Sequence, residues 1–360
     1  MTTLPLSRSH LRAMLRLMRA LYRLQRLPAY RQQLAARLPA VARFDPGHDS
    51  VMMGYDFHLT ANGPRLIEVN TNAGGALLAQ RAYRPDFPSD LPGPQYRPLT
   101  QLLESFFQEM RLFSRGRQTK PERLVILDEE PEKQYLAEEM ELLCTLFNRQ
   151  GIAAALADPR QLQPQREGIH YQGQRVDLIY NRHCDFYLES APMAAVRAAY
   201  LAGHICLTPN PHTYALLADK RRMILWSDPA ALAALGVAQS DREILQEMVP
   251  LCRLLADLDP VALWTTRKQW VFKPVTAFGS RGVLLGDSIS RQRFQALDPH
   301  TTLVQQFIPP TLLPDRGMKV DWRLFVYQNK LLGVAPRVYQ GQVTNFRSPG
   351  SGYATVRLLP

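Results

Sequence analysis

The sequence predicts a mixed protein, in which a small parallel α/β domain is followed by an α+β region with an antiparallel sheet. Strand-like and helical runs alternate over residues 119–210, and short strand-like runs separated by turn signals fill residues 211–360. Alternation of this kind favours a parallel sheet, whereas consecutive short strands favour antiparallel pairing. We expect two further parts before them, a basic helical segment over 1–49 and a hairpin with a linker over 50–118.

The composition is that of a folded protein with two or three domains. The chain has 360 residues, 46% of them hydrophobic and 21% charged, which excludes a coiled coil, a collagen and a mostly disordered chain. No apolar run is long enough to predict a membrane span, and no signal peptide follows Met1. The four cysteines are too widely spaced for a metal pair or a disulfide framework, so we expect a reducing, cytoplasmic location.

The net charge of +11 is concentrated near the N-terminus. Residues 1–43 contain nine arginines and no acid, which leaves about +2 for the rest of the chain. Within a predicted helix over 7–27, six of the arginines recur at helical spacing and form one basic stripe: Arg8, Arg12, Arg16, Arg19, Arg23 and Arg26. We expect this helix to cap the fold with a solvated face. A surface for anionic lipid, nucleic acid or a partner protein, or an organelle transit peptide, is the alternative.

Because the charge is confined to one segment, we do not expect nucleic acid as a partner of the folded region.

The remaining elements follow from local patterns. Residues 50–70 predict a β-hairpin that turns at an Asn-Gly pair, 82–99 a loop and 100–114 a helix. The α/β domain is expected to have strands over 123–129, 151–159, 174–182 and 205–210 and helices over 131–151 and 193–203. The last region is expected to have a helix over 213–226 and strands over 269–275, 282–286, 302–308, 321–328, 330–339 and 353–359.

Two lysines and a glycine-rich loop indicate a phosphate-binding site. A strand delivers Lys273, and a loop with Gly279, Ser280 and Gly282 follows. Glycines let backbone N–H groups approach a phosphate closely, and a lysine adds a point charge. Because the lysine precedes the glycines, this is not a Walker loop, and a hairpin turn is the alternative. Lys220 lies early on the helix predicted upstream; by itself it is typical of an exposed lysine.

A polar pair in an apolar strand is a candidate for contact with an adenine edge. Gln305 and Gln306 are followed by Phe307 and Ile308, and the backbone of this run can offer hydrogen-bonding groups to a base. A plain strand is the alternative.

The predicted hairpin brings a set of hard oxygen ligands together. Glu68 and Asn70 are two residues apart, so both side chains leave the same face of one strand. A turn centred near residue 62 puts Asp56 almost opposite Glu68. Two carboxylates and an amide oxygen suit Mg²⁺ bound alongside phosphate oxygens, and carboxylates this close repel each other without a cation. A solvated polar face is the alternative.

Taken together, these elements resemble the ATP-grasp superfamily. That family usually has a helix lysine, a strand lysine, a glycine-rich loop, an adenine-contacting strand and an arginine, and then Asp followed by Glu-x-Asn. Here Lys220, Lys273, the glycine loop, the 305–308 strand and Arg337 come in that order, but the Asp and Glu-x-Asn lie at 56–70. The sequence therefore looks like a circularly permuted ATP-grasp ligase, similar to eukaryotic-type glutathione synthetase. Residues 50–75 should then pair with strands of 320–350 in one sheet.

The resemblance covers roughly residues 50–360 and implies roles for individual residues. Lys220 and Lys273 would hold the ATP phosphates, Asp56, Glu68 and Asn70 would hold Mg²⁺, and Arg337 and Arg323 would stabilise the transferring phosphoryl group. The substrate residues it implies are Arg182, Asn72, Gly74, Gly75 and, from a segment similar to the ending of ordinary ATP-grasp ligases, Asn345. In contrast to that family, the loop over 275–282 has no acid.

The resemblance implies ATP-dependent ligation of a small carboxylate to an amine, such as an amino acid or short peptide, through an acyl phosphate. It also implies a homodimer. A phosphotransferase that stops at phosphorylation, and a non-catalytic nucleotide-binding protein that uses its basic helix for partner binding, are the alternatives.

Overall fold

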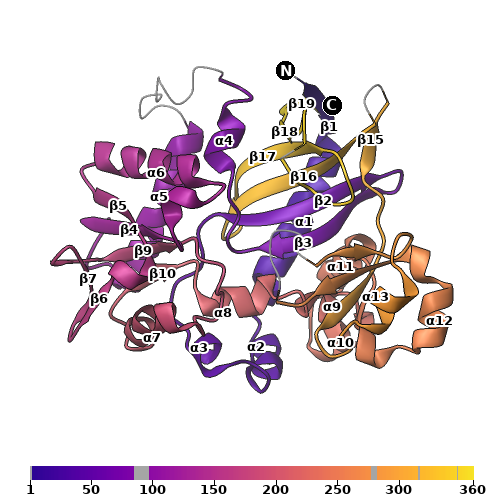
Figure 1. Ribbon diagram of the computed structural model, residues 1–360, viewed down its shortest axis with the longest axis horizontal. Helices are drawn as coiled ribbons and strands as arrows, with labels where there is room; N and C mark the ends of the chain where they lie inside the picture. The colour runs from indigo at the N-terminus through magenta and orange to yellow at the C-terminus, as the bar shows by residue number, and fades with distance from the viewer. Residues whose placement is uncertain (1, 85–96, 277–281, 315–316, 347) are drawn as a thin grey trace.

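The computed structural model describes residues 2–84, 97–276, 282–314, 317–346 and 348–360. Figure 1 shows a parallel sheet on the left, a six-stranded antiparallel sheet in the centre and a smaller antiparallel sheet at the lower right. The two ends of the chain lie side by side, because β1 (Thr3–Ser7) pairs in parallel with β19 (Thr355–Leu359). Strand β1 was not predicted from the sequence.

The predicted parallel domain is confirmed. Its sheet has the order β10-β9-β4-β5, and every pair is parallel. The strands are β4 (Arg123–Leu127), β5 (Ala153–Ala157), β9 (Leu178–Asn181) and β10 (Cys206–Thr208), and the helices are α5 (Arg97–Phe113), α6 (Ala137–Arg149) and α7 (Ala194–Leu201). A small antiparallel sheet is added by β6 (Gln163–Gln165), β7 (Gly168–Tyr171) and β8 (Gln174–Arg175). Since the chain builds first to one side of β4 and then to the other, the strand order reverses between β4 and β9.

The central sheet joins two distant parts of the sequence, as expected. Strand β16 (Met318–Tyr327) pairs with β2 (Met53–Thr60), so that Arg323 lies opposite Asp56. The full order is β18-β17-β16-β2-β3, with β3 (Gly63–Asn70), β17 (Lys330–Tyr339), β18 (Gly352–Tyr353) and, beside β16, β15 (Thr311–Leu313). The predicted hairpin and the pairing of residues 50–75 with 320–350 are therefore confirmed.

Alternation along β16 gives the central sheet one apolar and one polar face. The even-numbered residues of β16 belong to the main apolar core: Met318, Val320, Trp322, Leu324 and Val326. Asp321 and Arg323 point the other way, because successive side chains leave opposite faces of a strand. The apolar face is covered by α1, whose buried Met14, Leu17 and Leu21 lie in the same core.

The N-terminal helix α1 (Arg8–Leu24) agrees with the prediction. Ser7 caps it by accepting a hydrogen bond from the backbone N–H of His10 at 3.1 Å. All six arginines of the predicted stripe are exposed. Two short helices follow, α2 (Pro28–Ala35) and α3 (Ala40–Arg43), and α4 (Ala76–Gln80) comes after β3.

The third sheet has the order β11-β14-β12-β13 and is antiparallel, again as expected. Its strands are β11 (Cys252–Leu254), β12 (Trp270–Pro274), β13 (Leu284–Leu285) and β14 (Thr302–Gln306). Around it and before it lie α8 (Pro211–Thr213), a π-helical turn over Tyr214–Ala218, α9 (Arg222–Trp226), α10 (Pro229–Ala234), α11 (Gln239–Met248), α12 (Pro260–Thr265) and α13 (Arg291–Gln295).

The helix predicted over 213–226 is interrupted. Asp219 has an extended backbone, and its buried carboxylate accepts hydrogen bonds from the Arg221 guanidinium (2.5 and 2.9 Å) and from the Tyr187 hydroxyl (2.8 Å). These bonds replace helix continuation at that point. Lys220 therefore lies in the turn before α9 and not on a helix.

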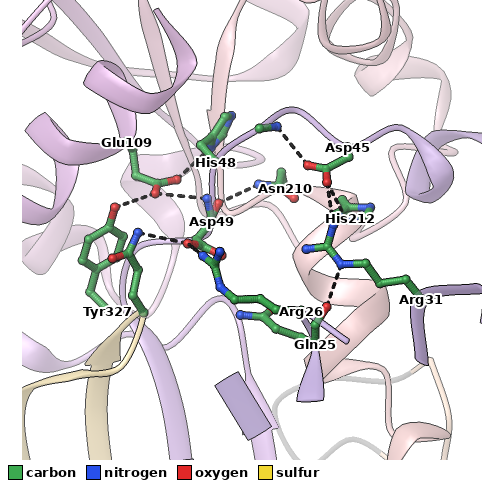
Figure 2. Close-up of polar contacts among 12 residues, drawn as sticks. Gln25, Arg26, Arg31, Asp45, His48, Asp49, Glu109, Asn210, His212 and Tyr327 are labelled. Carbon is green, nitrogen blue, oxygen red and sulfur yellow. Dashed lines mark hydrogen bonds and ion pairs between the residues drawn. The ribbon is translucent and has the colours of Figure 1, made fainter. Parts of the chain in front are cut away.

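A buried polar cluster ties the parallel domain to the central sheet and to α1 (Figure 2). Glu109 of α5 accepts a hydrogen bond from the Tyr327 hydroxyl at 2.7 Å and contacts His48 Nδ1 at 2.8 Å. Next to it, Asp49 accepts from Arg26, which lies just after the end of α1, at 2.9 Å. It also accepts from Gln328 at 3.0 Å. Because each group is held by partners from other elements, the cluster fixes how these parts meet.

In the part of the chain that the structure describes, no helix is long and apolar enough to cross a membrane.

Candidate active site

The polar face of the central sheet carries an alternating array of charges. The Asp56 carboxylate accepts two hydrogen bonds from Arg323, at 2.7 and 2.6 Å, and lies 2.9 Å from an Arg337 nitrogen. Arg337 in turn donates to Asp321 at 2.5 Å. The four residues come from β2, β16 and β17, where the strand register sets Asp56 opposite Arg323 and Asp321 opposite Arg337.

Charge pairing outweighs burial at Asp56. Burial alone would raise the pKa of this carboxyl, but Arg323 and Arg337 lower it to about 2. Burial likewise disfavours the charged form of Arg337, yet Asp321 and Asp56 raise the pKa of its guanidinium. Asp56 and Arg337 are therefore both charged at neutral pH, and both arginines are fixed in place by carboxylates.

Glu68 and Asn70 lie beside this array. Asp56 and Glu68 are directly opposite each other in the hairpin, as predicted. The Asn70 amide nitrogen lies between them and donates to Asp56 at 3.3 Å and to Glu68 at 3.2 Å. No described residue donates to the side-chain oxygen of Asn70. That oxygen and the Glu68 carboxylate can therefore accept or coordinate a further partner.

These observations divide the expected metal ligands into two groups. Both oxygens of Asp56 accept from guanidinium groups, and a divalent cation there would lie against two fixed positive charges. In this structure Asp56 therefore holds the two arginines in position, and its oxygens are engaged by them. The Glu68 carboxylate and the Asn70 side-chain oxygen suit Mg²⁺, which is commonly held by one or two protein oxygens together with waters and substrate phosphates. No cluster of three His, Cys, Asp or Glu suited to a metal occurs among the described residues.

A β-bulge links the hairpin to the third sheet. The pairing of β2 with β3 shifts by one residue after Asp56, so Ile67 is the extra residue. Its carbonyl oxygen accepts hydrogen bonds from Lys273 Nζ and from Gln305 Nε2, both at 3.2 Å. The bulge thus holds the end of the Lys273 side chain next to the strand that bears Glu68.

Lys273 is held in a strongly desolvated position. Burial lowers the pKa of its ammonium group; Glu68 opposes this, and the nearby Lys220 adds to it. An anion at this point would relieve both the burial and the repulsion between the two lysines. Gln305 is also buried, and no described residue contacts its amide oxygen within hydrogen-bonding distance.

The other expected nucleotide contacts differ from one another. Gln306 is exposed, and its N–H donates to Leu251; the N–H of Phe307 donates to Gln269. Ile308 is buried, and its carbonyl oxygen contacts His58 Nδ1 at 2.7 Å. These backbone groups are therefore already used within the fold. Gly279 and Ser280 lie outside the described residues. Gly282 has φ +72°, and a Cβ atom there would meet Pro274 at 2.8 Å, so the position requires glycine.

The segment after Asn70 passes between the central sheet and the parallel domain with no space for side chains at its two glycines. A Cβ atom on Gly74 would meet Arg182 at 2.5 Å, and one on Gly75 would meet the Tyr353 hydroxyl at 1.6 Å. The Gly74 carbonyl accepts from Arg323 at 3.4 Å. Gly75 also has φ +97°, which side chains rarely allow.

Glu139 fixes this turn and was missed by the sequence analysis. It is buried in α6, and its carboxylate accepts from the N–H groups of Gly75 at 2.6 Å and Leu77 at 2.9 Å. A carboxylate at the start of α4 satisfies N–H groups that the helix leaves unpaired. No local pattern marks this role, because an acid in an amphipathic helix normally faces solvent.

Arg182 lies at the carboxyl end of β9, where the strand order of the parallel sheet reverses. Ligands of open α/β sheets bind in the crevice at such a point. Arg182 is buried and donates to the Tyr180 hydroxyl at 3.2 Å, and its carbonyl accepts from the Asn72 amide at 2.6 Å. By contrast, Asn345 holds its own loop through bonds to Gln340 and Ser348.

Comparison with known proteins gives a likeness of fold. Neither protein-family models nor the sequences of curated proteins gave a match. A crystal structure from Methylobacillus flagellatus KT, provisionally identified as a gamma-glutamylcysteine synthetase, has a TM-score of 0.53 and 11% sequence identity, over 99% of this chain and 90% of that one. A second, the ATP-grasp ligase PsnB complexed with minimal precursor, Mg and ADP, has a TM-score of 0.29 and 12% identity over 65% of this chain and 87% of that one. The fold of this chain is similar to that of the first structure along almost its entire length.

Proposed function

We propose that this protein is an ATP- and Mg²⁺-dependent ligase of the ATP-grasp type that joins a carboxylate to an amine, with the metal motif supplied by a circularly permuted hairpin. One observation carries the proposal. The bulge carbonyl of Ile67 holds Lys273, so a buried lysine from the third sheet lies within the electrostatic reach of Glu68 and Asp56. Asp56 in turn binds the two arginines of the central sheet. A site with this set of charges suits a nucleoside triphosphate and an acyl phosphate.

Each charged group has a defined part in this reaction. Lys273 and Lys220 would hold phosphate oxygens, and Arg323 and Arg337, fixed by Asp56 and Asp321, would face the charge of the transferring phosphoryl group. Glu68 and Asn70 would hold Mg²⁺, which when bound would neutralise phosphate charge. Arg182, at the reversal of the parallel sheet, would bind a substrate carboxylate.

The proposed ligation has two steps. A carboxylate oxygen attacks the γ-phosphorus and the bond to the β-phosphate oxygen breaks, which yields an acyl phosphate and ADP. The amine nitrogen then attacks the acyl carbon, the carbon–oxygen bond to phosphate breaks, and the nitrogen proton passes to the departing phosphate. Positioning and charge neutralisation supply most of the acceleration in such steps.

Product analysis tests the proposal. ADP release should be measured with Mg²⁺ against a panel of amino acids and short peptides, with hydroxylamine present to trap an acyl phosphate as a hydroxamate. We expect ADP and hydroxamate in equal amounts, and loss of both in Glu68→Gln but not in a matched change of the exposed Glu122 to Gln. A phosphorylated product without hydroxamate or amide would instead establish a phosphotransferase. Nucleotide binding without turnover would establish a binding protein.

A further inference from the structure

A small polar pocket lies at the junction of the glycine turn and the parallel sheet. It is lined by residues that follow β3, β9 and β10 and by the start of the π-helical turn: Thr71, Asn72, Asn181, His183, Phe186, Pro209, Asn210 and Tyr214. No carboxylate, lysine or arginine is among the described residues that line it. The pocket has room for about one water-sized group.

Two buried side-chain atoms of this lining have no hydrogen-bond partner among the described residues. They are Thr71 Oγ1 and Asn72 Oδ1. The orientation of the Asn72 amide is settled by its nitrogen, which donates to the Arg182 carbonyl at 2.6 Å. Its oxygen is therefore an acceptor that lacks a donor. Leaving such an atom unsatisfied costs about 1–3 kcal/mol, so native proteins rarely do so.

The other amides that line the pocket are already used. Asn210 donates to the Asp49 carbonyl at 2.7 Å and accepts from the Thr213 N–H at 2.9 Å. Asn181 accepts from the His183 N–H at 3.2 Å. One wall is rigid, because the rings of Phe186 and Tyr214 stack with centroids 4.3 Å apart. The bonding capacity of the pocket is therefore concentrated on Thr71 and Asn72.

We propose that this pocket receives the nitrogen of the amine co-substrate, and that its size restricts that nitrogen to ammonia or a primary amine. This inference rests on the proposed ligase function. A free acceptor needs an N–H donor. No lysine or arginine lines the pocket to bind the carboxylate partner, for which Arg182 and the arginines of the central sheet are available.

The location fits this role. Thr71 and Asn72 come directly after Asn70, and Gly74, two residues on, contacts Arg323 through its carbonyl. The pocket therefore opens from the same short segment that borders the charged face of the central sheet.

A binding experiment tests the inference without turnover. Thermal unfolding of the full chain should be followed in ammonium, methylammonium or tetramethylammonium chloride, with potassium chloride at the same ionic strength as reference. We expect ammonium and methylammonium to raise the melting temperature with concentration and tetramethylammonium to have no effect, since a ligand that binds only the folded state stabilises it. In Thr71→Val, which keeps the shape but removes the hydroxyl, the rise should shrink; in Thr213→Val, a buried threonine outside the pocket, it should persist.

Kinetics with small nucleophiles provide the second readout. With hydroxylamine as the amine, Thr71→Val should raise the KM for hydroxylamine about 5-fold or more, the loss of one hydrogen bond, and leave the KM for ATP unchanged. N-methylhydroxylamine should be a poor substrate of the wild type and a better one of Thr71→Ala. If ammonium stabilises no more than potassium, or Thr71→Val lowers only the melting temperature, the pocket holds a structural water and the inference is wrong. Absence of ADP release with every acid would refute the proposed function instead, while the ammonium result would still decide whether the pocket binds N–H donors.

Discussion

Replacing Asp56 by Asn gives the most direct test of how the charged face is held together. The substitution keeps the shape of the side chain and removes the charge that Arg323 and Arg337 share. The pKa of Asp56 is lowered to about 2, almost two units below an ordinary aspartate, so the folded state favours the charged form by about 2 kcal/mol. Because the amide also turns an N–H toward a guanidinium, the loss can reach the 3–5 kcal/mol typical of a broken buried pair. We expect unfolding free energy at pH 7 to fall by about 2–5 kcal/mol.

Urea unfolding measures this loss, and pH separates its causes. A group whose pKa is lower in the folded state adds stability above its unfolded pKa and loses it as the pH falls toward the folded value. The difference between wild type and Asp56→Asn should therefore shrink by about 1 kcal/mol between pH 7 and pH 3. The exposed Asp287→Asn should change stability by less than about 0.5 kcal/mol. A loss below about 1 kcal/mol, or a variant more stable than wild type in the absence of Mg²⁺, would mean that Asp56 is a metal ligand after all and that the arginine pairing is weak.

Three further predictions concern the turn, its support and acid sensitivity. Gly75→Ala should cost several kcal/mol in urea unfolding, whereas Gly63→Ala, at nearly the same φ (+98°) but with open space around the added Cβ, should cost only about 1 kcal/mol; equal losses would remove the steric argument. Glu139→Gln should raise the KM for the substrates and reduce ADP release, because one of the two backbone N–H groups that donate to Glu139 loses its acceptor. The exposed Glu141→Gln should change neither quantity, and unchanged kinetics in Glu139→Gln would refute a positioning role. Burial lowers the pKa of His58, so its neutral form adds stability that declines as the pH falls below about 6.5, and His58→Gln should show a shallower decline between pH 6.5 and 5 in thermal unfolding; a decline as steep as in the wild type would contradict this.

The parts of the site that depend on local pattern were predictable from the sequence. The turn near Asn62 sets the hairpin register and puts Asp56 close to Glu68. Their direct opposition also needs the one-residue bulge at Ile67, without which Asp56 would face Ile67. The pairing of β2 with β16 did not come from local pattern; it followed from the order of the motifs, because distant strands carry no mark of their partners. The alternation of apolar and polar residues in β16 then assigns one face to the core and the other to the site.

The remaining features depend on contacts that short sequence windows do not contain. The bulge adds Ile67 as one extra residue to β3, and its carbonyl matters only because Lys273 comes from another sheet. The pairing of Asp56 with Arg323 and Arg337 depends on β16 and β17, which lie far away in the sequence. Asp219 breaks a run of good helix formers because its carboxylate binds the distant Tyr187 as well as its neighbour Arg221. In each case a tertiary partner outweighs the local preference.

The pairing of β2 with β16 also constrains how the protein can be made on the ribosome. Asp56 is synthesised early, but its guanidinium partners come more than 260 residues later in the chain, as the sequence separation of 267 from Arg323 shows. At translation rates of about 5–20 residues per second, the hairpin waits for about ten seconds or more with the edge of β2 that later pairs with β16 still open. Helix α1, made earlier, can already cover its apolar face. The parallel domain, whose strands lie close together in the sequence, can fold during that interval. We therefore expect the open edge of the hairpin to be the segment of the nascent chain most in need of a chaperone, and the charged face of the central sheet to be assembled last.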